Sequence, residues 1–185
     1  MKLYQVAPDE RFESVVPVDR SEWDRFCMLD GTTQRKSWVP ILVRRVAEDE
    51  GRHFETADFP WLGSHVLVMR RRATEVLAEL LNEYGELLPL ECADAELWAY
   101  NVCRVVDALD EERAKIARFP GTGRIMSVER YAFRPEQVDG HLLFKLRQLP
   151  LGPIVVSDAF VQLVRSRQLV GLDFQAIWEG VALSH

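Results

Sequence analysis

Two stretches of the chain share one order of elements, in which an apolar strand precedes a helix, a glycine and a second strand. The first stretch is His65–Glu91 and the second is Pro153–Trp178. In the first, apolar residues at three- and four-residue spacing predict a helix with one buried face. Gly85 is expected to end this helix. That face consists of Ala73, Val76, Leu77, Leu80, Leu81 and Tyr84. The shared order of elements is consistent with an ancient duplication and equally with two unrelated, ordinary supersecondary units.

The second stretch has clear signals at both ends of its helix. Ser157 follows the apolar strand 154–156 and is a favoured N-cap residue, with Asp158 beside the positive end of the helix dipole. Gly171 then interrupts the chain before strand 172–178, in which alternate residues share one face. Both helices therefore need a sheet on which to pack.

The rest of the chain adds short strands. Alternating or apolar runs predict them at 3–6, 14–18, 41–46, 87–91, 96–106, 124–133 and 142–146. A capping box at Ser21 predicts a short helix that ends before Gly31, and residues 107–119 are expected to open with a helical turn. We expect an α+β fold with a mixed, largely antiparallel sheet and two main helices. The single domain spans 1–185, with a less regular N-terminal part at 1–57.

Composition places the chain among cytoplasmic proteins. Hydrophobic residues make up 48% of its 185 residues, which suffices for a core. No apolar run approaches the roughly 20 residues of a membrane helix, and the N-terminus lacks the features of a signal peptide. The three cysteines, Cys27, Cys92 and Cys103, are irregularly spaced, so we expect reduced thiols and no disulfide framework.

Charge is distributed unevenly along the chain. Between Ala73 and Glu112 lie eleven Asp or Glu and one base, Arg104, whereas Arg113–Arg147 holds eight Lys or Arg against three acids. Direct binding of nucleic acid requires a basic stripe, so this pattern argues against it. An acidic face could steer a basic partner instead. The alternative is that the acids cover ordinary solvated surfaces, and the sequence does not reveal whether segment 73–112 forms one face.

No motif for catalysis, metal or cofactor binding emerges. The histidines are scattered and form no close pair with a cysteine, unlike zinc ligands. A nucleophile elbow is absent, and Gly121–Arg124 lacks the pattern of a phosphate-binding loop. A cysteine and a histidine that are distant in the sequence could still meet in the folded chain, so a catalytic Cys–His pair stays an alternative. We therefore expect no cofactor and no enzyme activity.

The carboxylates Asp107, Asp110, Glu111 and Glu112 are the strongest site candidates. Three interpretations compete: a solvated acidic helix start, a surface that binds a protein, and a metal or acid–base site. The calcium-loop spacing is missing. We predict that these four residues contact a protein partner.

The chain resembles an immunity-protein family of bacterial polymorphic toxin systems, a myxobacterial-type domain first described as a domain of unknown function. The resemblance is ordered along the chain after about Ser37 and is best over 58–185. The stretches that carry it are 58–63, 86–90, 101–110, 124–126, 154–160 and 169–174. Met69-Arg70 departs from the family pattern, which has a serine before the helix, and we interpret the difference as a changed cap.

The resemblance implies a cytoplasmic antidote in bacterial competition, which binds and neutralises a cognate toxin stoichiometrically. It supplies no catalytic residues. The toxin would be a basic protein, with a nuclease as one example. The alternatives are a structural or adaptor protein of a secretion or toxin system, and an enzyme acting on a small substrate.

Overall fold

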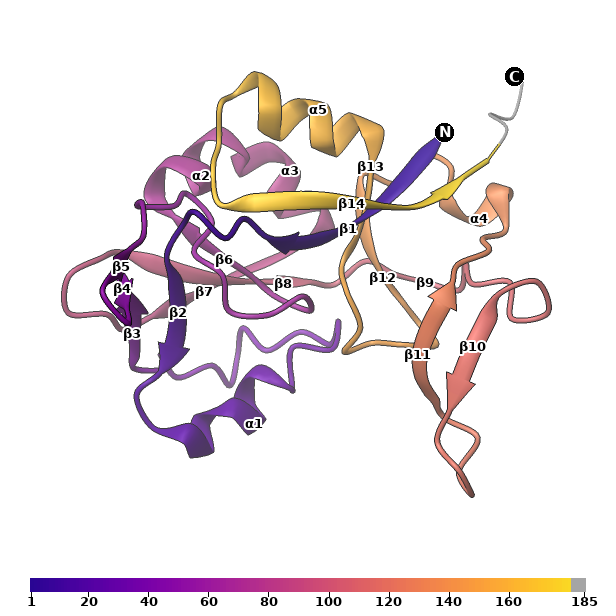
Figure 1. The fold of residues 1–185 in the computed structure, drawn as a ribbon, viewed down its shortest axis with the longest axis horizontal. Helices are drawn as coiled ribbons and strands as arrows, with labels where there is room; N and C mark the ends of the chain where they lie inside the picture. Colours follow the sequence, from indigo (N-terminus) through magenta and orange to yellow (C-terminus); the bar gives the residue numbers. More distant parts are fainter. Residues whose placement is uncertain (181–185) are drawn as a thin grey trace.

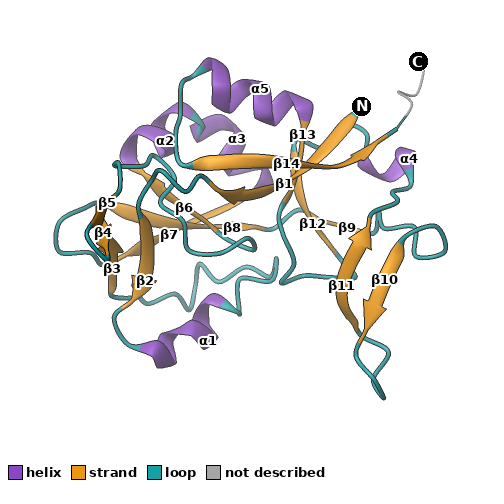
Figure 2. Cartoon of the chain, viewed as in Figure 1, coloured by secondary structure: helices purple, strands orange, loops and turns teal. Residues whose placement is uncertain are grey.

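The computed structural model describes residues 1–180 and contains short helices and many strands (Figures 1 and 2). The helices are η1 (Arg20–Glu22), α1 (Trp23–Phe26), α2 (Arg71–Val76), α3 (Ala78–Tyr84), α4 (Pro135–Val138) and α5 (Asp158–Ser166). The first strands are β1 (Lys2–Pro8), β2 (Ser14–Pro17), β3 (Val43–Val46), β4 (Glu48–Asp49), β5 (Arg52–His53), β6 (Leu67–Arg70) and β7 (Gly85–Leu90). The others are β8 (Leu97–Val102), β9 (Val105–Val106), β10 (Lys115–Arg118), β11 (Ile125–Arg130), β12 (Leu143–Leu146), β13 (Val155–Ser157) and β14 (Leu172–Glu179).

The strands form a five-stranded sheet, a three-stranded sheet and three hairpin-like pairs. The five-stranded sheet has the order β14-β1-β13-β12-β9, in which only β12 and β9 are parallel. The three-stranded sheet has the order β6-β8-β7 and is antiparallel. The α+β class with a mixed, largely antiparallel sheet is confirmed.

The two similar stretches of sequence have the same topology. β6 and β7 both pair antiparallel with β8, so they run parallel to each other, and α2 and α3 connect them. β13 and β14 both pair antiparallel with β1, and α5 connects them. Each unit is therefore a split β-α-β motif with one antiparallel strand inserted. In Figure 1, α2, α3 and α5 lie on the same side of the sheets.

One core lies between these helices and both sheets. Met69, Tyr100, Val156 and Phe160 belong to a single buried cluster that joins residues of the two units. A second cluster, which includes Phe26, Leu29, Val68 and Ala99, fills the space between α1 and the three-stranded sheet. The helices thus stabilise the fold by covering apolar sheet faces, as their patterns predict.

The long predicted helix is divided at Leu77. Its backbone there has φ −104° and ψ 10°, outside the helical range, although the amide of Leu77 still donates to the carbonyl of Ala73. The hydroxyl of Thr74 bonds back to the carbonyl of Arg71 at 2.8 Å, an interaction that tends to bend helices. Ala73 and Leu77 are buried as predicted, whereas Val76 is exposed.

Gly85 ends α3 and begins β7 in an extended conformation. A Cβ atom at this position would lie 2.2 Å from the carbonyl oxygen of Asn101 and 2.9 Å from the ring of Tyr100. The glycine is therefore needed for the close approach of β7 to β8 and not for a left-handed cap.

Two local details differ from the sequence-based expectations, and a third agrees. The first helical segment is capped by Asp19, whose side chain accepts the amide of Ser21, so Ser21 is not the cap. The charged run 48–52, which lies outside the predicted strands, contributes to the β4–β5 hairpin. In the second unit, by contrast, Ser157 caps α5 by accepting the amide of Phe160 at 3.5 Å, which confirms the prediction.

Candidate functional site

The four predicted contact residues, Asp107, Asp110, Glu111 and Glu112, lie between β9 and β10, and we call them the acidic shoulder. The expected helical turn is present, because the amide of Ala114 donates to the carbonyl of Asp110 at 2.9 Å, but it does not continue into a helix. The carboxylate of Asp110 accepts the backbone amides of Glu112 and Arg113, each at 3.2 Å, and thereby forms a side-chain-capped turn. The chain then continues directly into strand β10.

Three of the four shoulder carboxylates meet cations of the same chain. Asp107 contacts Arg134 at 3.3 Å and also Arg147. Two further pairs are Asp110–Arg113 at 3.6 Å and Glu111–Arg118 at 2.6 Å. Among the residues that the structure describes, Glu112 alone of the four has no ion pair. Much of the shoulder's negative charge is therefore balanced locally.

The acidic segment 73–112 does not form one face. Glu75, Glu79 and Glu83 lie on α2 and α3, while the shoulder lies at the other end of the segment beyond β9 (Figure 1). Glu86 is buried, and Asp94 and Glu96 pair with arginines. A partner can therefore meet only a part of this charge at once.

Glu86 and Asn101 belong to an interior polar cluster that also includes Cys103 and Lys145. Glu86 accepts the amide of Gln34 at 2.6 Å, the hydroxyl of Thr33 at 2.7 Å and the amide of Asn101 at 2.9 Å. Burial raises the pKa of Glu86, but these hydrogen bonds outweigh it, so the pKa is lowered. The carboxylate thus holds the loop after α1 against β7 and β8.

Cys103 is not equipped to act as a nucleophile. Burial, followed by the nearby charge of Glu86, raises the pKa of its thiol to about 11. The thiol is therefore protonated at neutral pH, whereas the reactive form of cysteine is the thiolate. Glu86 and Asn101 in this cluster join backbone segments through their hydrogen bonds.

Lys145 is fully buried beside this cluster. Its ammonium donates to the carbonyl of Leu29, and burial lowers its pKa to about 8, against the opposing effects of Asp30 and Cys103. A buried cation of this kind costs stability unless it is fully compensated. Lys145 therefore couples the loop after α1 to strand β12 in a manner that depends on pH.

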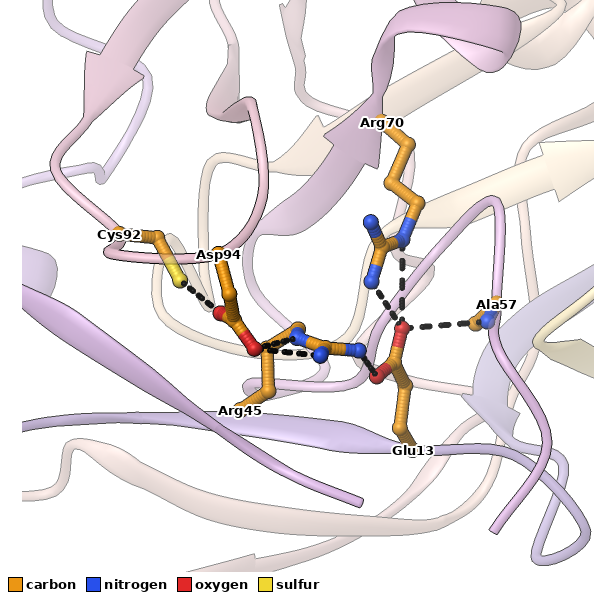
Figure 3. Close-up of polar contacts among 6 residues, drawn as sticks. All are labelled: Glu13, Arg45, Ala57, Arg70, Cys92 and Asp94. Atoms are coloured by element: carbon orange, nitrogen blue, oxygen red, sulfur yellow. Dashed lines mark hydrogen bonds and ion pairs between the residues drawn. The ribbon is translucent and has the colours of Figure 1, made fainter.

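A second charged network, absent from the sequence-based predictions, surrounds Glu13 (Figure 3). The buried carboxylate of Glu13 contacts Arg45 at 2.7 Å and Arg70 at 2.5 Å. Arg45 also binds Asp94, and this pairing lowers the pKa of Asp94 to about 2. The network fastens the segment before β2 to β3, β6 and the loop after β7.

The side chain of Arg70 forms an ion pair and does not cap α2. It occupies the N-cap position of α2 but makes no side-chain cap hydrogen bond. Its guanidinium binds the buried carboxylate of Glu13 instead. No spacing rule signals this, because Glu13 and Arg70 are separated by 57 residues.

The described residues contain no evident metal site and no membrane helix. Within residues 1–180, no three His, Cys, Asp or Glu side chains are grouped to hold a metal ion. No helix of this part of the chain is long and apolar enough to cross a bilayer.

Comparison with known protein families gives a match to part of the chain. Residues 91–179 match the family described as Immunity protein family (Imm11). The match covers β8 to β14 and so includes the acidic shoulder, the β10–β11 hairpin and α5. No curated protein matches the chain. The match confirms the resemblance for the stretches 101–110, 124–126, 154–160 and 169–174, whereas 58–63 and 86–90 lie outside the matched residues.

Proposed function

Because residues 91–179 match an immunity-protein family, which supports a role in immunity to a toxin, we propose that this chain binds and neutralises a cognate bacterial toxin. Neutralisation is stoichiometric and occurs by protein–protein contact in the cytoplasm of the cell that carries the antidote. The family match is the observation on which this proposal rests.

The geometry of the surface supports binding rather than catalysis. A large groove lies between β11 and the loop after β12, and no Cys, His, Asp or Glu lines it. The half-buried thiol of Cys103, which is protonated at neutral pH, does not offer a nucleophile elsewhere. Neither this groove nor the surroundings of Cys103 therefore offers a pair of groups suited to acid–base work.

The acidic shoulder contributes to this function by guiding the encounter. Glu111 and Glu112 are exposed, and Glu112 has no ion pair among the described residues. Exposed charges of this kind mainly affect the association rate and its dependence on salt. A basic toxin surface, such as that of a nuclease, would complement them.

The proposal is tested by producing the chain together with the toxin candidate encoded by the neighbouring gene in a susceptible bacterium. We expect growth to be restored and a 1:1 complex to be purified. Growth arrest with both proteins soluble and no complex would contradict toxin neutralisation. Capture of a component of the secretion machinery in place of the toxin would favour the adaptor alternative.

Reversing the charge of the exposed shoulder should slow binding of the toxin. For Glu111→Lys combined with Glu112→Lys, we expect the association rate constant to fall roughly tenfold at low salt, with the difference shrinking as salt screens it. Stopped-flow or biolayer measurements at several salt concentrations check this.

The matched control is Glu75→Lys combined with Glu79→Lys, which makes the same charge change on the exposed side of α2 and α3. A comparable loss in both double variants would indicate a net-charge effect. No loss in the shoulder variant, at any salt concentration, would remove Asp107, Asp110, Glu111 and Glu112 as contact residues.

A further inference from the structure

A large groove separates the β10–β11 hairpin from the loop that follows β12. Its volume is about 730 Å³. The hairpin side includes Phe119, Arg124, Met126 and Val128, and the loop side includes Leu149 and Leu151. In Figure 1 the hairpin extends from the end of the molecule that also carries β9 and α4. The groove lies beside the acidic shoulder, because Gln148, which lines the groove, donates to the carboxylate of Asp107 at 2.5 Å.

The groove exposes apolar surface. Phe119, Met126 and Leu151 are 49%, 51% and 44% exposed, and all three line it. Large apolar side chains gathered in one concave place are typical of binding sites, whereas single exposed ones are ordinary. Methionine is also common where a surface must adapt to a partner.

Both walls of the groove have defined shapes. On the hairpin, Ala117 is opposite Ser127 and Arg118 is opposite Ile125, so Met126 is the extra residue of a β-bulge. Bulges redirect side chains and recur at functional places. On the loop, the amide of Gly152 donates to the carbonyl of Leu149 at 2.9 Å, which closes a turn. A partner would thus meet a largely pre-formed surface.

The charge around the groove is opposite to that of the shoulder. The hairpin strands and their turn carry Lys115, Arg118, Arg124 and Arg130 against one acid, Glu129. Lys115 pairs with Glu129, and Arg118 pairs with Glu111. Within residues 1–180, Arg124 and Arg130 have no ion pair. The groove therefore suits an apolar side chain with a carboxylate next to it.

We propose that this groove holds an apolar anchor residue from an acidic segment of the cognate toxin. The proposal rests on toxin neutralisation and adds the place and chemistry of contact. The apolar anchor fills the space between Met126 and Leu151, and a neighbouring carboxylate of the toxin pairs with Arg124. Because the acidic shoulder adjoins the groove, the two regions require opposite charges and so fix the orientation of the toxin.

The test uses the full chain and the toxin candidate encoded by the neighbouring gene. Met126→Asp and Leu151→Asp should each weaken the complex about 30-fold, since buried anchors dominate interface affinity. Arg124→Glu should weaken it about tenfold. The matched controls are Leu42→Asp, whose leucine is 46% exposed outside the groove, and Arg165→Glu on the exposed side of α5. Thermal unfolding verifies that each variant is folded.

The outcomes separate this proposal from the one on which it depends. If the unchanged chain binds the toxin and only the groove variants lose affinity, the groove is the anchor site. If the unchanged chain binds and the folded groove variants bind equally well, the groove proposal is wrong and toxin neutralisation stands. If the unchanged chain does not bind, both are wrong. If Met126→Asp abolishes self-association without changing toxin affinity, the groove serves a second copy and the proposal is overturned.

Discussion

Replacing Glu13 with Gln is expected to lower the free energy of unfolding by roughly 3–5 kcal/mol, the cost of breaking a buried ion pair by removing one partner. The side chain of Glu13 is 0% exposed and contacts both Arg45 and Arg70. An amide would keep the size of the side chain but direct a donor group towards two guanidinium groups. Urea denaturation monitored by tryptophan fluorescence measures the change.

The control for Glu13→Gln is Glu96→Gln, which makes the same chemical change in an exposed pair. Glu96 contacts Arg71 at 2.6 Å, but their side chains are 60% and 62% exposed. Exposed pairs typically contribute under about 1 kcal/mol. Equal effects of the two substitutions would show that burial of Glu13 does not stabilise the fold as we infer.

Stability is also expected to depend on pH through Lys145. Its folded-state pKa, about 8, lies below its ordinary value of 10.5. Below pH 8 both folded and unfolded chains hold the proton, and the folded chain bears the cost of a buried charge. Between these values the unfolded chain binds more protons, so stability rises with pH. Loss of the proton from Lys145 in the folded chain is therefore expected to raise the free energy of unfolding by about 3 kcal/mol.

Comparison with Lys145→Met isolates this contribution. Cys103 acts in the opposite direction, because its raised pKa makes stability fall as pH increases beyond 9. The stability of the unchanged chain relative to Lys145→Met should therefore increase by about 3 kcal/mol between pH 7 and 10.5. Lys115→Met, which removes an exposed ammonium, is the control variant. A difference that stays constant over this range would contradict a buried charged lysine.

Local signals explain which elements are predictable from sequence. Ser157, Asp158 and the apolar face of α5 act within a few residues of one another, so the start of this helix follows directly from them. Residues 107–119 lack such a determinant. The side chain of Asp110 captures two amides, and the following segment pairs with β11 to form a strand. A segment that begins with several carboxylates can form either a helix or a turn followed by a strand.

The charged interior of the molecule is set by contacts across long sequence separations. Glu13 is 32 residues from Arg45 and 57 from Arg70, and Glu86 binds a loop 51–53 residues away. These residue types are common on surfaces, so neither their identity nor their spacing signals burial. The same limit applies to the shoulder, whose position follows from sequence but whose neutralising partners, Arg134 and Arg147, do not.

The placement of β1 has a consequence for synthesis on the ribosome. β1 ends at Pro8, whereas its two neighbours in the sheet, β13 and β14, begin far later along the chain, at Val155 and Leu172. At typical elongation rates, roughly 8 to 30 s pass before the ribosome reaches them. During this interval both edges of β1 lack their final partners. A nascent chain therefore cannot complete this sheet until residues Leu172–Glu179 have been synthesised.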